Sequence, residues 1–170
     1  MKSDMGGAAA VLGFFKSLGE MGDLRDERRV VAVIPLTDNM PDGRATKPGD
    51  VVSSLSGKTV EVVNTDAEGR LILCDAITHG LEKEPALVVD IATLTGACVM
   101  ALGGRVGGLF TNRDVLAENI KNFSGDTGEQ LWPLPVFELY FDELKSQVAD
   151  LRNVGGARWG GASVAAMFLK

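Results

Sequence analysis

Histidine, cysteine and tyrosine are scarce in this sequence of 170 residues, which contains one histidine, two cysteines and one tyrosine. Cys74 and Cys98 lie far apart in apolar segments, which excludes a disulfide framework and a paired-cysteine zinc motif. We expect both to be buried, reduced thiols. A histidine-rich zinc site or a Ser-His-Asp triad would have to use His79. Because His79 ends an apolar helical pattern, a role at the helix C-terminus is favoured instead.

Positively charged residues are also fewer than negatively charged ones. The 17 Lys and Arg residues are outnumbered by 23 Asp and Glu residues, which gives a net charge of −6 and a pI near 4.8. This balance argues against nucleic-acid partners and acidic membrane surfaces. The cluster of Arg25, Arg28 and Arg29 is interpreted as a solvated helix end or loop. The sequence shows no bilayer-length apolar run and no signal-peptide pattern, so we expect a cytoplasmic location.

Glycine, by contrast, is abundant, with 21 residues against an average share of about 7%. Many occur in pairs, which are typical of tight turns or close backbone approach. The segment of residues 103–108 (GGRVGG) superficially resembles a phosphate-binding loop. It lacks the Lys-Ser/Thr ending of a P-loop and the spacing of a dinucleotide fingerprint. We therefore interpret it as tight packing turns.

Apolar periodicity predicts strands that alternate with helices. Strands are expected at residues 29–36, 58–63, 86–91 and 106–111, and helices at 5–20, 70–80, 114–123, 137–145 and from 161 onward. Residues 38–57 are expected to be a loop, and residues 132–135 to be extended. This order predicts an α/β fold with a mixed, mostly parallel sheet and helices on both faces, a three-layer α/β/α arrangement. Helical patterns run up to both ends, so we expect a single, incomplete domain over residues 1–170, truncated at both ends.

Two tryptophans and one aspartate need a separate interpretation. Trp132 and Trp159 are interpreted as core or interface anchors. Asp90 interrupts the apolar run of residues 86–91. It is either a buried carboxylate with its hydrogen bonds satisfied or a partner of a site residue, and both readings stay open.

The segment richest in candidate catalytic and metal-binding residues is 64–71 (NTDAEGRL), directly after a predicted strand. In open α/β sheets, ligand sites gather at the carboxyl ends of strands. Asp66 and Glu68 are two residues apart, and crowded carboxylates repel each other unless a proton or a cation compensates. A hard divalent metal is the natural compensation, and Arg70 adds a permanent charge. The alternative is a polar turn in which Asp66 caps the following helix.

The complete string NTDAEGRL resembles the signature of the leucine aminopeptidase (cytosol aminopeptidase) family. Further stretches resemble the same family in the same order: residues 1–9 (MKSDMGGAA), 48–51 (PGDV), 56–61 (SGKTVE), 92–97 (ATLTGA), 148–153 (VADLRN) and 160–162 (GGA). The resemblance covers essentially all 170 residues. It implies the catalytic domain of an exopeptidase that removes the N-terminal residue, preferably leucine-like, from peptides through a water activated by two metal ions.

The resemblance also implies roles for individual residues. Asp4, Asp66 and Glu68 match ligands of a two-metal centre, in which the Glu68 position bridges both ions. Arg70 matches an arginine that works with a bound bicarbonate. Three further positions match residues whose backbone binds the substrate: Thr93, Leu94 and Gly96. The oxygen-rich ligands admit manganese or zinc, with magnesium or cobalt also compatible. A hexameric homo-oligomer is implied as well.

One departure from the family pattern concerns the positions ahead of Met1. There the family supplies a metal-ligating lysine, a second bridging aspartate and a catalytic lysine, and Lys2 does not match any of them. We therefore expect the isolated 170-residue chain to be inactive. A non-catalytic relative that acts in assembly or binding, and another two-metal hydrolase such as a phosphatase, are the alternatives. The presence of Asp4, Asp66, Glu68 and Arg70 favours the aminopeptidase.

Overall fold

The computed structural model describes residues 3–21 and 29–170. Lys2, Arg25 and Arg28 lie outside this part of the chain. The described helices are α1 (Gly6–Glu20), α2 (Glu68–Leu81), α3 (Gly96–Leu102), α4 (Asp114–Thr127) and α5 (Gly161–Leu169), with 3₁₀ helices η1 (Thr65–Ala67) and η2 (Glu138–Leu144). The strands are β1 (Val51–Ser53), β2 (Thr59–Glu61), β3 (Val106–Leu109), β4 (Gln130–Pro133) and β5 (Leu151–Arg152). No described helix combines the length and apolarity needed to cross a membrane.

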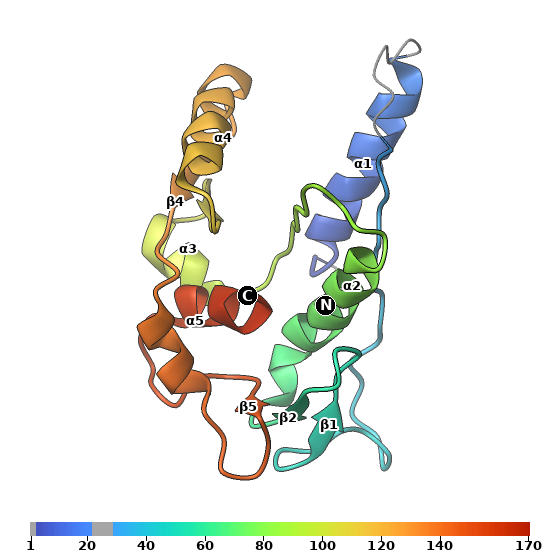
Figure 1. Ribbon diagram of the computed structural model, residues 1–170, viewed down its shortest axis with the longest axis vertical. Helices are drawn as coiled ribbons and strands as arrows, with labels where there is room; N and C mark the ends of the chain where they lie inside the picture. Colours follow the sequence, from blue (N-terminus) through green and yellow to red (C-terminus); the bar gives the residue numbers. More distant parts are fainter. Residues whose placement is uncertain (1–2, 22–28) are drawn as a thin grey trace.

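The strands form two small sheets. In the first, β2 is central and pairs antiparallel with β1 and parallel with β5, with Val60 opposite Leu151. In the second, β3 and β4 pair in parallel, with Gly107 opposite Leu131. Figure 1 shows α3, β4 and α4 along one side of the molecule, α1 and α2 along the other, and α5 between them. The predicted α/β fold with a mixed sheet is confirmed.

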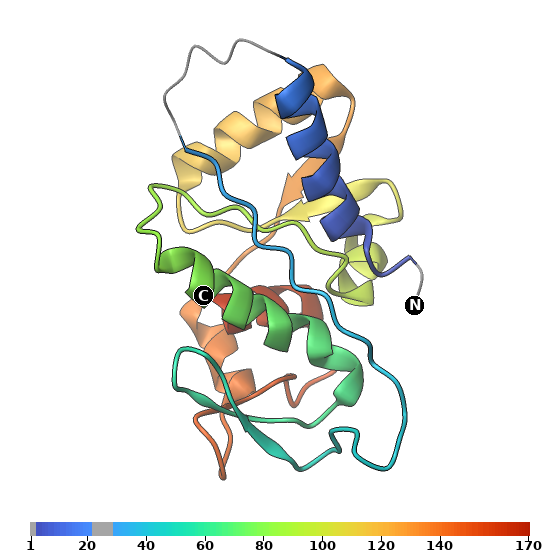
Figure 2. The ribbon, with the colours of Figure 1, turned by 90° about the vertical axis from the view of Figure 1, so that its right-hand side faces the viewer.

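Two of the predicted strands are wrong within the described structure. Residues 29–36 and 86–91 have no regular secondary structure, although both are rich in β-branched residues. A strand needs a hydrogen-bonded neighbour and a surface to cover its side chains. The apolar pattern describes the segment's own residues and does not show whether a neighbouring strand is available to pair with it. Val31, Leu36 and Val89 are 49%, 77% and 62% exposed. Figure 2 shows the segment that follows residue 29 running beside α2 as an extended chain.

The other predicted elements agree more closely with the structure. The helices at residues 5–20, 70–80, 114–123 and from 161 are confirmed, and so are the strands at 58–63 and 106–111. The helix predicted at residues 137–145 is the 3₁₀ helix η2. Strand β1 lies inside the expected loop at residues 38–57. Strand β5 was not predicted, because two residues are too few to show alternation.

The hydrophobic core lies where α5 packs against η2, α2 and the first sheet. Its buried members come from elements far apart in sequence: Val60, Leu144, Leu151, Val164, Met167 and Phe168. The two tryptophans are not core residues, since Trp132 is 53% exposed and Trp159 is 75% exposed. Trp132 instead lies under the ammonium group of Lys121, 4.8 Å from the ring centre. Tryptophan size favours burial, but both side chains lie at the surface.

Gly7 shows the close backbone approach that the sequence predicted. A Cβ on Gly7, in the first turn of α1, would collide with the carbonyl group of Ile91, so packing requires glycine there. This contact places the start of α1 against the segment that leads to Thr93. A Cβ on Gly107, in β3, would meet only the end of the Leu131 side chain, at 2.6 Å, which can move away.

The cysteines are only half-buried free thiols, so the prediction that they are buried is wrong. Burial raises the pKa of Cys74 to about 11, helped by the neighbouring Asp75 carboxylate. Its thiol therefore stays protonated near neutral pH and is a poor nucleophile. His79 is exposed in the last turn of α2, and its Nδ1 lies 3.0 Å from Glu82 Oε2.

Candidate active site

The loop between β2 and α2 begins its turn at Asn64. The Asn64 side chain accepts a hydrogen bond from the Asp66 N–H at 2.9 Å, which starts the 3₁₀ turn η1. Helix α2 begins at Glu68, and no side chain caps it. The alternative in which Asp66 caps this helix is therefore wrong, because Asn64 supplies the cap one turn earlier. This leaves Asp66 exposed and Glu68 half-buried at the start of α2.

Asn39 orients the Glu68 carboxylate. Its Nδ2 donates to Glu68 Oε2 at 2.8 Å and to the Thr65 carbonyl oxygen at 3.0 Å. One asparagine thus joins a side chain and the backbone of the carboxylate loop from 29 residues away. Sequence reasoning missed Asn39, because a polar residue in an irregular stretch has no periodic signal.

Asp4 and Thr93 meet although they are 89 residues apart. The Thr93 hydroxyl donates to Asp4 Oδ1 at 2.9 Å. The tight contact of Gly7 with Ile91 brings the start of α1 to this segment. The structure thus joins a predicted metal ligand to a predicted substrate-binding residue.

The other two predicted substrate-binding positions lie at the start of α3. Leu94 is half-buried, and its Cδ1 would lie 3.4 Å from a Cβ placed on Gly69. Gly96 is the first residue of α3, which Thr95 caps by accepting from the Cys98 N–H. The contact between Leu94 and Gly69 places residues 93–96 beside the carboxylate loop.

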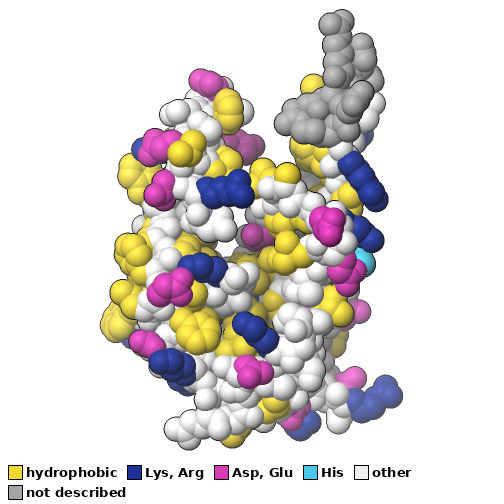
Figure 3. All heavy atoms as spheres, viewed as in Figure 1, with side chains coloured by type: hydrophobic (Ala, Val, Ile, Leu, Met, Phe, Trp, Pro, Cys, Tyr) yellow, Lys and Arg dark blue, Asp and Glu magenta, His cyan; other side chains and the backbone are white. Residues whose placement is uncertain are grey.

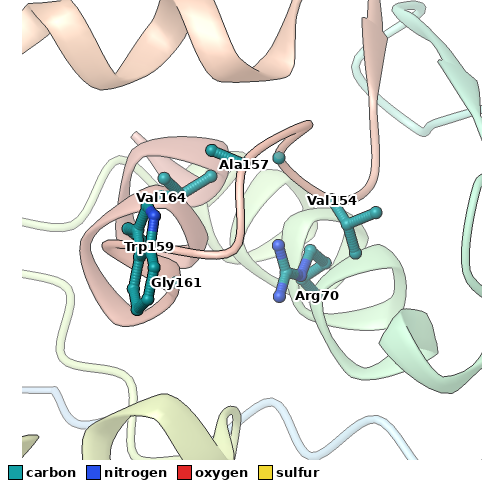
Figure 4. A pocket seen from close by; sticks show the side chains of 7 residues that line it. Arg70, Val154, Ala157, Trp159, Gly161 and Val164 are labelled. Atoms are coloured by element: carbon teal, nitrogen blue, oxygen red, sulfur yellow. The ribbon is translucent and has the colours of Figure 1, made fainter.

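Arg70 is the most buried charged group of this region. It is 7% exposed, and its Nε, which is inaccessible to solvent, has no hydrogen-bond partner. Desolvation lowers the pKa of the guanidinium. Figure 4 shows Arg70 beside a cavity of about 130 Å³, with Val154, Ala157 and Trp159 on its wall. A buried cation with an unused donor favours an anion as partner.

Three carboxylates are predicted as metal ligands, and the described structure does not gather them into one cluster. Within residues 3–21 and 29–170, no group of three or more His, Cys, Asp or Glu side chains is arranged to hold a metal ion. Asp66 and Glu68 share one helix start, and Asp4 lies at Thr93. The ligand set of Asp4, Asp66 and Glu68 therefore stays a prediction.

Comparison with known proteins assigns the chain to a family. The sequence model of the cytosol aminopeptidase family, catalytic domain, matches residues 1–170. The chain belongs to the cytosol aminopeptidase family. A probable cytosol aminopeptidase of Nitratidesulfovibrio vulgaris is 59% identical over 171 residues, and one of Syntrophobacter fumaroxidans is 56% identical over 170 residues. The alignment covers 100% of this chain and 33% of each relative, so the chain spans about a third of their length.

Solved structures of aminopeptidases show the same fold. A variant of tomato leucine aminopeptidase matches with a TM-score of 0.88 and 45% identity, over 99% of this chain and 33% of that chain. The cytosol aminopeptidase of Coxiella burnetii matches with a TM-score of 0.72 and 46% identity, over 75% of this chain and 28% of that chain. The α/β arrangement described here is thus the one found in part of these aminopeptidases.

The residues of this cytosol aminopeptidase family member suit the groups that the resemblance implies. Asp4, Asp66 and Glu68 offer carboxylate oxygens, the ligand type that hard divalent cations prefer. Arg70 offers an unpartnered, buried Nε beside a small cavity, which suits a small planar anion such as bicarbonate. The cavity lies beside the exposed loop of residues 156–160, from which Ala157 and Trp159 line it.

Proposed function

We propose that this chain contributes to the active site of a metal-dependent aminopeptidase that removes N-terminal residues, leucine-like ones preferred, from peptides. The observation that carries the proposal is the environment of Arg70. Its guanidinium is buried with an unused donor, in the first turn of the helix that Glu68 begins. A solvated turn without a catalytic role would have no reason to bury an uncompensated charge.

Asp4, Asp66 and Glu68 are proposed to hold two divalent ions, with manganese or zinc as the leading candidates and magnesium or cobalt also compatible. Such ions, when bound, lower the pKa of water and polarise a scissile carbonyl group. The chain's own contribution is orientation. Asn39 fixes the Glu68 carboxylate at 2.8 Å, and Thr93 fixes Asp4 at 2.9 Å.

Arg70 is proposed to bind bicarbonate and to stabilise negative charge near the reacting carbonyl. Fixed donors in a site without bulk water stabilise developing charge strongly, because they need no reorganisation during the reaction. The backbone of Thr93, Leu94 and Gly96 is proposed to bind the peptide substrate. These residues lie beside both Asp4 and the carboxylate loop, which supports a shared site.

Setting and assembly form part of the same proposal. The chain spans about a third of the length of these relatives. We propose that it is part of a longer, cytoplasmic polypeptide that assembles into a hexamer.

The deciding experiment compares leucyl-anilide with N-acetyl-leucyl-anilide as substrates of the longer polypeptide, with added Mn²⁺ or Zn²⁺. Selectivity for a free α-amine predicts cleavage of the first substrate alone. Equal cleavage of both would indicate a different peptidase or esterase activity. Cleavage of neither, by folded and metal-loaded protein, would favour the non-catalytic alternative.

A further inference from the structure

Asn153, which directly follows β5, is a fully buried polar residue with 0% exposure. Its backbone N–H donates to the Glu61 carbonyl oxygen at 2.9 Å and so extends the pairing of β5 with β2. Burying a primary amide is unfavourable unless its donors and acceptor find partners. The hydrogen-bond partners of the side chain should therefore explain why an asparagine is buried here.

Every partner of the Asn153 side chain belongs to the loop that follows β2. Its Oδ1 accepts from the N–H groups of Val63, at 2.8 Å, and Asn64, at 3.3 Å. Its Nδ2 donates to the carbonyl oxygens of Asn64, at 2.7 Å, and Ala67, at 3.4 Å. The amide thus spans the loop from Val63 to Ala67, the last residue of η1.

We propose that Asn153 is a positioning residue for the carboxylate loop. By holding the backbone at both ends of residues 63–67, its amide sets where Asp66 and Glu68 present their carboxylates. A primary amide is suited to this task, because it offers two donors and an acceptor on one short, rigid group. The part of this inference that concerns metal binding rests on the proposed function, whereas the loop geometry does not.

If Asn153 had only a structural role, it would serve to hold β5 against β2. A second side-chain contact in the same sheet has that role and offers a comparison. Asp150 Oδ2 accepts from both the N–H and the hydroxyl of Thr59, each at 2.8 Å. The contact of Asp150 with Thr59 joins the same two strands at the end away from the carboxylate loop. Thr59→Val, which removes the hydroxyl and keeps the shape, is therefore a matched control.

The test uses NMR on the longer polypeptide that contains this chain and on its Asn153→Asp, Asn153→Ser and Thr59→Val variants. Amide hydrogen exchange of Asp66 and Ala67 reports the loop, because neither N–H contacts Asn153 itself. We expect exchange at both amides to accelerate about tenfold in the Asn153 variants. Thr59→Val should leave both unchanged at a comparable loss of Tm. Unchanged exchange in a folded Asn153 variant would overturn the inference.

Titration with Mn²⁺ extends the test to the metal site, since the ion broadens nearby amide signals even when it binds weakly. In the wild type we expect broadening centred on Asp66 and Glu68. The Mn²⁺ concentration for half-broadening should rise several-fold in Asn153→Ser and stay constant in Thr59→Val. Equal half-broadening in both variants would overturn the positioning role at the metal site. No localised broadening in the wild type would count against the proposed function and leave the exchange result to decide the loop.

Discussion

Arg70 and Asn39 are the residues whose surroundings say most about function. The Arg70 guanidinium is buried and its Nε has no hydrogen-bond partner. The Asn39 side-chain amide donates to the Glu68 carboxylate and to the backbone carbonyl of Thr65. One residue is placed to hold an anion and the other to orient a ligand. Substitutions at the two positions should therefore have different consequences.

Arg70→Ala in the longer polypeptide should lower kcat by about 10²–10³-fold and leave the metal content intact. The reason is that arginine stabilises negative charge and does not ligate cations. Glu68→Ala should instead strip metal, because its carboxylate is a proposed bridging ligand. Elemental analysis alongside kcat separates the two roles, with Arg105→Ala, at an exposed position away from the cavity, as control. Loss of metal from Arg70→Ala as great as from Glu68→Ala would refute the assignment.

Asn39→Ala should weaken metal binding about fivefold, since an exposed hydrogen bond of this kind contributes about 1 kcal/mol. Glu68 would keep its charge and lose the donor that orients it. Isothermal titration with Mn²⁺ measures the change. The control is Asn119→Ala on the exposed surface of α4. Identical affinities in the two variants would show that Asn39 has no part in orienting Glu68.

At the scale of elements, the first sheet depends on a charged contact at one end. The Asp150 carboxylate accepts from the Thr59 N–H and hydroxyl. Chiefly through that backbone hydrogen bond, the contact lowers the pKa of Asp150 below its ordinary value of 3.8. A carboxyl whose pKa is lower in the folded state stabilises the fold above its unfolded pKa. That stabilisation is lost as the pH falls through the folded pKa.

The Asp150→Asn variant should therefore be less stable than the wild type at about pH 6, and the difference should shrink as the pH is lowered to about 3. Thermal unfolding of both proteins across this range measures the effect. His79 and Glu82, at the far end of α2, form a second exposed pair, so Glu82→Gln serves as a control for a general surface-charge effect. A difference in Tm that stays constant across the range would contradict the linkage.

At the scale of the whole molecule, a large apolar surface is left uncovered. The segments 29–36 and 86–91 expose Val30, Leu36, Leu87 and Val89, and α1 exposes Leu12 and Phe14. Figure 3 shows hydrophobic side chains spread over both sides of the face it displays. Extended, unpaired backbone beside apolar side chains is a template for association with other chains.

The 170-residue chain by itself should therefore be inactive towards leucyl-anilide at saturating Mn²⁺ and should self-associate. Three carboxylates are too few ligands for two ions that must activate water, and the open surface favours oligomers of mixed size. Turnover measurements and light scattering over a range of concentrations test the two expectations. Activity within about tenfold of the longer polypeptide would mean that another group completes the site.

Local sequence was enough to predict α1, α2, α4 and α5, whereas α3 was not predicted. The helix that carries Arg70 follows from apolar spacing, and Asp66 and Glu68 are two residues apart in the chain wherever the loop lies. The order of motifs was likewise sufficient for the family. Each of these properties depends on residues within a few positions of one another, so no knowledge of the fold is needed to find them.

Only the tertiary structure decided which distant groups meet. Asn39 and Asn153 reach the carboxylate loop from 29 and 86–90 residues away, and Thr93 reaches Asp4 from 89. Motif resemblance marks Thr93 and residues 148–153, but no local pattern shows which distant groups these residues contact. The burial of Arg70, and the failure of residues 29–36 and 86–91 to pair as strands, are decided in the same way. Hydrogen-bond partners and solvent exposure are set by the packing of separate elements, which local periodicity does not encode.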